Sequence, residues 1–188
     1  MRWKVQLIAI AAGIIMIAEP GAARAQSQDE TPRFEAGVQL VGLHLNGTGE
    51  GSAGIGGRFG MNLTKYVSLE AETNYFPKNP SGNYGETLGL FGVKLTKRFD
   101  RFGVFAKARP GFIHFSGDLA SRLSRKDQFA FDAGGGFEFY PNTHTVLRFD
   151  IGDTIIPYGN TTILLGPSPT TLGTRNNLQF EIGFAVRF

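Results

Sequence analysis

The final segment of the chain, residues 177–188, alternates strictly between apolar and polar or small side chains. The apolar positions are Leu178, Phe180, Ile182, Phe184, Val186 and Phe188. Because side chains of a strand point alternately to opposite faces, this pattern predicts a strand with one uninterrupted apolar face. A strand between lipid and a polar interior needs this alternation over about ten residues, and a strand of a soluble sandwich is the alternative.

The same alternation recurs along the rest of the chain. The eight alternating segments are 34–44, 52–63, 67–76, 87–99, 102–115, 129–140, 143–152 and 177–188. Leu88 and Leu90 depart from the pattern, because they are apolar on the otherwise polar parity. Pro110 lacks a backbone donor within its segment, which predicts a bulge or a bend there.

The connections between these segments alternate in length. The tight connections are 64–66, 100–101 and 141–142, and the long connections are 45–51, 77–86, 116–128 and 153–175. Short turns at one end and long loops at the other are typical of outer-membrane barrels, in which the short turns are periplasmic. The pattern predicts an all-β fold for residues 34–188, an eight-stranded antiparallel up-and-down transmembrane β-barrel.

Residues 1–25 have the layout of a secretory signal peptide. Arg2 and Lys4 precede an apolar run over 5–18, and a small-x-small cleavage pattern ends the segment. An uncleaved anchor is the alternative, but the run is shorter than the ~20 residues that a spanning helix needs. We expect export with cleavage, a short polar lead at 26–33, and localisation in the outer membrane of a Gram-negative bacterium.

Composition and charge exclude several classes of function. The chain has no Cys, so it has no disulfide framework and no thiolate chemistry. Much of the formal charge of +3 lies within residues 1–25, and the nearly neutral remainder does not support binding to nucleic acid. The run at 134–136 is Gly-Gly-Gly inside a predicted strand, and it lacks the Lys-Ser/Thr of a phosphate loop.

The chain from about Phe34 to Phe188 resembles the small bacterial outer-membrane β-barrel family. That family includes opacity-type adhesins and the membrane domain of OmpA-like proteins. The shared features are the signal peptide, the eight alternating segments and the terminal Phe188. The resemblance implies that the outer-membrane insertion machinery reads Phe188 as an assembly signal. It also implies outer-membrane lipid as a partner and an extracellular ligand at the long loops.

The polar parity of the predicted strands collects charged residues of both signs. They are Glu35, Arg58, Glu70, Glu72, Lys94, Arg98, Lys107, Arg109, Asp132, Glu138, Arg148, Asp150, Glu181 and Arg187. Eight strands enclose an interior just wide enough for side chains, where charges are costly unless they are paired. We therefore predict an ion-pair network that plugs the lumen, and a path for protons or ions is the alternative.

Adjacent strands indicate which of these charges meet. Glu70 and Glu72 lie on the predicted strand between those of Arg58 and Lys94. We expect these two carboxylates to pair with the neighbouring cations, including Arg98.

The search for catalytic chemistry finds one pattern, and no His pair has the spacing of metal ligands. His114 and Ser116 resemble the His-x-Ser pair of lipid A deacylase barrels, and Asp118 or Asp127 is placed to orient the imidazole. The residues that flank that family's pair are not matched. The simpler assignment is an interfacial aromatic belt that His114 shares with Phe112, Phe115 and Phe129.

The sequence thus predicts a surface protein of the outer membrane with a plugged lumen and a structural or adhesin-like role. It predicts no catalytic residues, no metal and no cofactor. A narrow porin is the second hypothesis, and a lipid A-modifying enzyme is the third. For segment 153–175 the alternatives are a binding surface, a lid over the mouth, or an extension of the two flanking strands.

Overall fold

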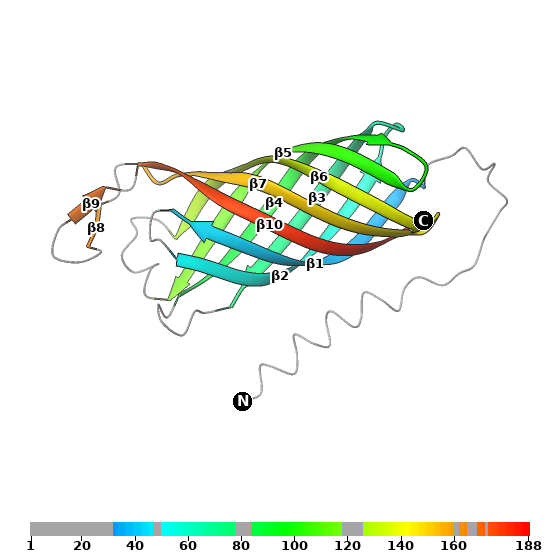
Figure 1. Ribbon diagram of the computed structural model, residues 1–188. Helices are drawn as coiled ribbons and strands as arrows, with labels where there is room; N and C mark the ends of the chain where they lie inside the picture. Colours follow the sequence, from blue (N-terminus) through cyan, green and yellow to red (C-terminus); the bar gives the residue numbers. More distant parts are fainter. Residues whose placement is uncertain are drawn as a thin grey trace, which may run out of the picture. The chain divides into compact units, whose positions relative to one another are not determined.

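The chain forms a closed barrel of antiparallel strands in a computed structural model (Figure 1). The structure describes residues 32–46, 50–77, 84–117, 126–159, 162–164, 169–171 and 173–188. The predicted signal peptide at 1–25, and all of the predicted lead except Pro32 and Arg33, lie outside these residues. The predicted eight-stranded antiparallel barrel is confirmed.

Eight strands close the barrel, and two short strands pair only with each other. The barrel strands are β1 (Phe34–Leu45), β2 (Glu50–Asn62), β3 (Val67–Phe76), β4 (Tyr84–Arg98), β5 (Phe102–Gly117), β6 (Asp127–Asn142), β7 (Thr145–Pro157) and β10 (Thr174–Arg187). The short strands are β8 (Thr162–Leu164) and β9 (Pro169–Thr171). Among the residues described, no helix is long and apolar enough to cross a membrane.

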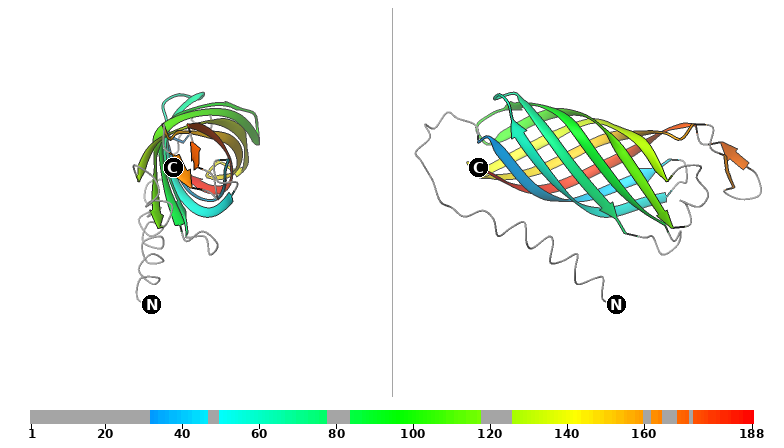
Figure 2. Two further views of the ribbon diagram at one scale, coloured as in Figure 1. Left: turned by 90° about the vertical axis from the view of Figure 1, so that its left-hand side faces the viewer. Right: turned by 180° about the vertical axis from the view of Figure 1, so that it is seen from behind.

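Consecutive barrel strands pair with each other, and β10 pairs with β1 to close the sheet, as Figure 2 shows in two views. The closure is staggered. If one starts at Phe34 and moves on each strand to the register partner on the next strand, the path around the barrel returns to β1 at His44 and not at Phe34. Such a stagger tilts the strands against the barrel axis. Side chains at one height in the lumen therefore come from strands that are not adjacent.

The two faces of the sheet have the predicted parity. Phe137 is 49% exposed on the outside, whereas the next residue, Glu138, is fully buried inside. Phe184 and Ala185 on β10 show the same contrast. An apolar outside around a polar inside is the arrangement that lipid requires, and it reverses the arrangement of a soluble protein.

Segment 153–175 contains more strand than its sequence predicted. β7 continues to Pro157 and β10 begins at Thr174, and these two residues still pair. β8 and β9 form a small hairpin between them along the chain. The assignment of 153–175 as one connection was therefore wrong at both ends, because pairing between two long strands continues through residues of weak alternation. The alternative that extends the flanking strands describes those ends.

The prediction of a bulge at Pro110 is wrong, because the register of β5 with both of its neighbours is unchanged there. Pairing between β4 and β5 lapses after Leu90↔Gly111 and resumes at Val93↔Ala108 in the same register. On its other side, Pro110 keeps its place opposite Phe131. The missing donor interrupts one ladder without inserting a residue. The register shift of the barrel lies elsewhere, in the pairing of β6 with β7 between Phe139 and Asn142.

The glycine run of β6 allows a close approach of β7. A Cβ built on Gly134 would lie 2.3 Å from the carbonyl oxygen of Ile151, and a Cβ built on Gly136 would lie 2.1 Å from that of Phe149. No side chain fits at these distances. The run therefore has a packing role within the sheet.

Candidate functional site

The barrel interior holds the charged residues that share the polar parity of the strands. All fourteen occupy inward positions, on the parity opposite to the exposed apolar residues of the outer face. The buried members are Glu35, Arg58, Glu70, Glu72, Lys94, Lys107, Arg109, Asp132, Glu138, Arg148, Asp150, Glu181 and Arg187. Arg98 is the remaining member and is partly exposed at the short-turn end. We call this set the charge layer.

Arg148 crosses the lumen. Its strand, β7, lies opposite β3 in the closed strand order. The Arg148 Nη1 atom lies 2.6 Å from Glu70 Oε1 on β3, and its Nε donates to Asp150 Oδ2 at 2.9 Å. The guanidinium also lies 4.2 Å from the centroid of the Phe105 ring. One side chain therefore connects two opposite walls of the barrel.

Two cations of β5 form a second centre of the charge layer. Arg109 Nη2 lies 2.7 Å from Asp132 Oδ2, and Arg109 Nη1 pairs with Glu72. Lys107 Nζ lies 2.8 Å from Asp150 Oδ1 and 3.3 Å from Asp132 Oδ2. Asp132 and Asp150 each contact more than one cation, so the pairs are joined into a network.

Lys94 continues this network toward the short-turn end. Its Nζ lies 2.6 Å from Glu138 Oε1 and 3.1 Å from Glu70 Oε1. The hydroxyl of Tyr140 donates to Glu138 Oε2 at 2.6 Å. Phe105 also faces inward, with its ring centroid 5.6 Å from Lys94 Nζ. The sequence analysis did not single out these two aromatics, although both stand on the polar parity of their strands.

The ion pairs differ from those expected between adjacent strands. Arg58 and Glu72 are register partners, yet Arg58 pairs with Glu35 at 3.0 Å and Glu72 pairs with Arg109. Because the strands are tilted, the charge nearest in height often lies two or more strands away. Adjacent strands hold the pairs of Glu70 with Lys94 and of Arg58 with Glu35, whereas the partner of Glu72 is Arg109, two strands away.

Arg98 and Arg187 share an aromatic partner at the short-turn end. The Nε of Arg98 donates to the Tyr140 hydroxyl at 3.2 Å, and the Arg187 guanidinium lies 4.4 Å from the centroid of the Tyr140 ring. Arg187 also donates to the carbonyl of Asn142 at 3.4 Å. The predicted pairing of Arg98 with Glu70 or Glu72 is wrong, because Arg98 lies nearer the short-turn end of the barrel than these carboxylates.

Amide side chains lie on the long-loop side of the charges. Gln39 donates to Asn74 Oδ1 at 2.9 Å, and Asn74 donates to Glu72 Oε1 at 2.7 Å. On β10, Gln179 donates to Glu181. Asn74 satisfies the Glu72 oxygen that Arg109 does not contact, and the amides separate the charges from an apolar region beyond them.

That apolar region lies in the lumen near the long-loop end, and we call it the apolar layer. Its members are Val41, Leu43, Leu45, Phe76, Leu88, Leu90, Ile113, Phe115, Ala130, Ile156 and Tyr158. Leu88 and Leu90 were the exceptions to the sequence pattern, and they belong here. The expected place of Phe115 in the outer aromatic belt is wrong, because its ring is fully buried. Burial also raises the pKa of Tyr158, which lies just beyond β7.

A second group lies on the outer wall at the long-loop end. His114 Nδ1 lies 2.6 Å from Asp127 Oδ1, and the two side chains are 44% and 73% exposed. Ser116 shares the outward parity of His114, and its hydroxyl donates to the carbonyl of Gly85 at 3.0 Å. Asp118, the other proposed partner of His114, lies outside the described residues.

Phe188 lies where β10 closes onto β1. Its N–H donates to the carbonyl of Phe34 at 2.9 Å, and the N–H of Phe34 donates to the carbonyl of Phe188 at 2.8 Å. The two ring centroids are 6.0 Å apart.

The described part of the chain contains no group of three or more His, Cys, Asp or Glu residues arranged to hold a metal ion.

Comparison with known proteins adds a family and a fold. Residues 9–188 match the family described as "Outer membrane protein beta-barrel domain". The N-terminal barrel domain of OprF from Pseudomonas aeruginosa is 11% identical, with 82% of this chain and 97% of that chain covered and a TM-score of 0.58. Neisserial surface protein A is 12% identical, covering 85% and 98% of the two chains with a TM-score of 0.54.

OprG from Pseudomonas aeruginosa is similar to the same degree, at 12% identity, with 85% and 97% of the two chains covered and a TM-score of 0.52. No curated protein matches the sequence. At these identities the solved structures show a shared fold.

Proposed function

Because the chain belongs to the outer membrane protein β-barrel domain family, we propose that it is an integral outer-membrane protein with a plugged lumen and a structural or adhesin-like surface role. It is exported with a cleaved signal peptide, and the insertion machinery reads Phe188 during assembly. Its short turns face the periplasm and its long loops face outward, as is usual for such barrels.

The observation that carries the plug is the sequence of layers in the lumen. The charge layer spans the barrel through Arg148 and Glu70, whose atoms lie 2.6 Å apart. The apolar layer fills the lumen beyond it, with Leu88 and Phe115 fully buried. A continuous water column has to pass both. The first layer holds most of its charges in ion pairs, and most side chains of the second offer water no hydrogen-bond partner.

Planar-bilayer recording separates the plugged barrel from the narrow porin. Purified protein that has folded into the bilayer is expected to show no stable open level at either polarity. A folded porin from the same host, reconstituted in parallel, controls for successful insertion. Steady, ion-selective conductance from the unmodified protein would overturn the plug and support the porin.

The surface role rests on the long connections at one end of the barrel. The predicted binding segments are 45–51, 77–86, 116–128 and 153–175. Grafted together onto a neutral barrel, they are expected to bring down the same extracellular ligand as the whole protein. A graft that captures nothing, beside an intact protein that does, would place recognition outside the loops.

A lipid-modifying esterase is the second candidate, and the His114–Asp127 pair favours it. A carboxylate 2.6 Å from Nδ1 orients an imidazole as a general base. Ser116 stands on the same outward face. In that reaction the Ser116 hydroxyl would pass its proton to His114 and attack an ester carbonyl, and the alcohol would leave with that proton. Water would then hydrolyse the acyl group from Ser116 and release the fatty acid. Its hydrogen bond to Gly85 would first have to break.

Acyl release from lipid A in mixed micelles tests the esterase. If the protein is an esterase, Ser116→Ala and His114→Ala each abolish release, whereas His44→Ala, an exposed histidine on β1, leaves it unchanged. Absence of release from the wild-type protein, or release that survives Ser116→Ala, removes this candidate.

A further inference from the structure

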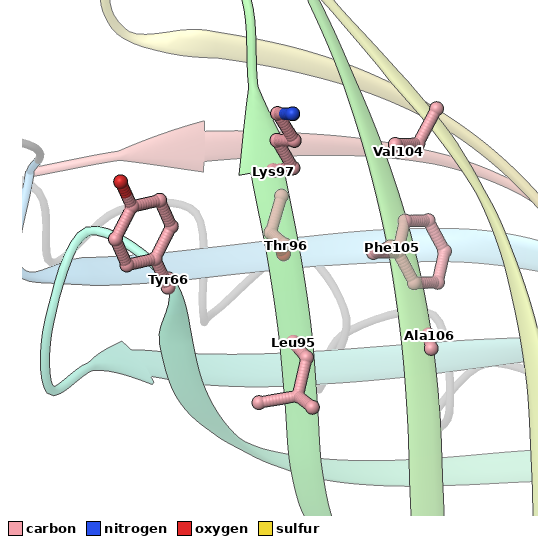
Figure 3. Close-up of a pocket in the computed structure, with 7 residues that line it drawn as sticks. All are labelled: Tyr66, Leu95, Thr96, Lys97, Val104, Phe105 and Ala106. Atoms are coloured by element: carbon pink, nitrogen blue, oxygen red, sulfur yellow. The ribbon is translucent and has the colours of Figure 1, made fainter.

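The lipid face of the barrel is hollowed near its short-turn end. An open groove of about 460 Å³ lies beside Tyr66, β4 and β5 (Figure 3). Its lining residues are Tyr66, Leu95, Thr96, Lys97, Val104, Phe105 and Ala106. Thr96 and Phe105 are buried on the inner side of the sheet, so the walls that lipid meets are formed by the other members.

The groove is polar at one end and apolar at the other. In Figure 3 the hydroxyl of Tyr66 and the ammonium of Lys97 point toward the same end, while Leu95 and Ala106 lie toward the opposite end. The polar end is the end of β4 that leads into the short turn at 99–101. The groove is therefore oriented like a lipid whose headgroup lies at the short-turn interface.

Cations gather at this polar end and are held by aromatic rings. Lys65 Nζ lies 4.9 Å from the centroid of the Tyr66 ring, and Lys97 Nζ lies 5.7 Å from that of Phe99. A cation above a ring is oriented by the ring's negative face, while a long Lys stem keeps the ammonium at the interface. Two ammonium groups are thus positioned where a headgroup phosphate would sit.

The exposed charges at this end are mostly positive among the residues that the structure describes. They are Arg33, Lys65, Lys97 and Arg101, against the side chain of Asp100. At a membrane surface such cations attract anionic headgroups. The charge thus complements an anionic phospholipid better than a zwitterionic one.

We propose that this groove binds an anionic phospholipid of the leaflet that faces the short turns. One acyl chain lies along Leu95, Val104 and Ala106, and the phosphate is bound by Lys65 and Lys97. The site is independent of the plugged lumen and of the surface role, because the residues that contact the lipid point away from the interior. It makes the protein selective for the lipid on one side of the membrane.

Quenching of a single tryptophan by brominated lipid tests the proposal. Trp3 is the chain's one tryptophan. The full chain is prepared with Trp3→Phe, and Phe99→Trp then places a reporter beside Lys97. Phe129→Trp places a control reporter at the other end, where Phe129 is similarly exposed. The vesicles contain phosphatidylcholine with equal fractions of either brominated phosphatidylglycerol or brominated phosphatidylcholine.

The reporter at 99 is expected to favour phosphatidylglycerol by roughly three- to fivefold in relative binding constant, and the reporter at 129 is expected to favour neither lipid. Lys65→Gln with Lys97→Gln removes the preference, and Lys126→Gln at the other end retains it. Ala106→Phe fills the groove without changing charge and also lowers the preference. Equal quenching by both lipids at 99 overturns the site, as does a preference that survives Ala106→Phe, since the charge alone would then suffice.

Discussion

Arg148 shows why single residues of the interior matter. It is fully buried, and its guanidinium contacts carboxylates on its own strand and on the opposite wall. A buried charge is tolerated only with its partners, so removal of one member leaves the others uncompensated. Ion pairs of this kind hold the barrel in one arrangement more than they add net stability.

Arg148→Met is expected to lower the free energy of unfolding by about 3 kcal/mol, the lower end of the range for breaking a buried pair. The lower end applies because Lys94 remains 3.1 Å from Glu70. Adding Glu70→Gln should cost less than its effect in the wild-type protein, since the carboxylate has by then lost a partner. Urea unfolding in lipid vesicles measures both changes.

Arg101→Met is the control, because Arg101 is exposed in a turn and exposed charges contribute little. If Arg148→Met unfolded at the same urea concentration as Arg101→Met, the pair across the lumen would not exist in the membrane.

At the residue scale, the sequence predicted which side chains turn inward but not all of their partners. Parity alone places Glu138 inside and Phe137 outside, because alternation is a property of the strand backbone. The partner of Glu72, which is Arg109 two strands away, depends on the stagger of the closed sheet, which no single strand encodes. The inward position of Phe105 and Tyr140 was not predicted, because an aromatic residue on the polar parity cannot be assigned to the interior until the cations around it are known.

The element that completes the barrel is β10. It pairs with β1 along most of its length, and the last backbone hydrogen bonds of that ladder join Phe188 to Phe34. The ring of Phe188 is 59% exposed on the lipid face, so it adds little to the packing of the barrel itself. The insertion machinery could therefore bind this exposed ring while β10 is still unpaired, before the barrel closes.

Deleting Phe188 is expected to slow insertion into the outer membrane while leaving export intact, because the deletion removes both the ring and two hydrogen bonds of the closure. Phe188→Ala keeps the hydrogen bonds and isolates the ring. Pulse labelling followed by the gel mobility of the folded barrel measures insertion, and Phe102→Ala serves as the control for an exposed ring at the same end. Insertion of both Phe188 variants at the wild-type rate would contradict a role for this residue in assembly.

At the element scale, the existence and order of the strands could be read from alternation, whereas their outer ends could not. Apolar residues such as Val41 and Ile113 occupy the inward parity there, so alternation fades where the apolar layer begins. The end of β7 was missed for this reason, and the start of β10 was missed because its first residues, 174–176, are all polar. The departure of Leu88 and Leu90 from the pattern was the visible sign of a layer whose extent only the closed barrel reveals.

In the plug that we propose, the barrel has two layers of different chemistry in series, which we call seals. The charge layer resists water by binding most of its charges together, and the apolar layer resists water because most of its side chains form no hydrogen bonds. The amides between them, such as Gln39 and Asn74, belong to the first seal through their contact with Glu72. Because the seals lie at different heights, loss of one leaves the other in place.

Conductance should therefore appear only when both seals are weakened. Leu88→Ala with Phe115→Ala thins the apolar layer. Glu72→Ala with Arg109→Ala removes the pair of these two charges and also takes Arg109 from Asp132, which keeps Lys107. Each double variant is expected to stay silent in planar bilayers once gel mobility shows that it has folded, whereas the combined variant should show brief openings. Phe112→Ala with Val104→Ala removes comparable volume from the lipid face and controls for general loosening. Steady conductance from either double variant alone would mean that the layer it weakens is the whole barrier, and that the other layer is only packing.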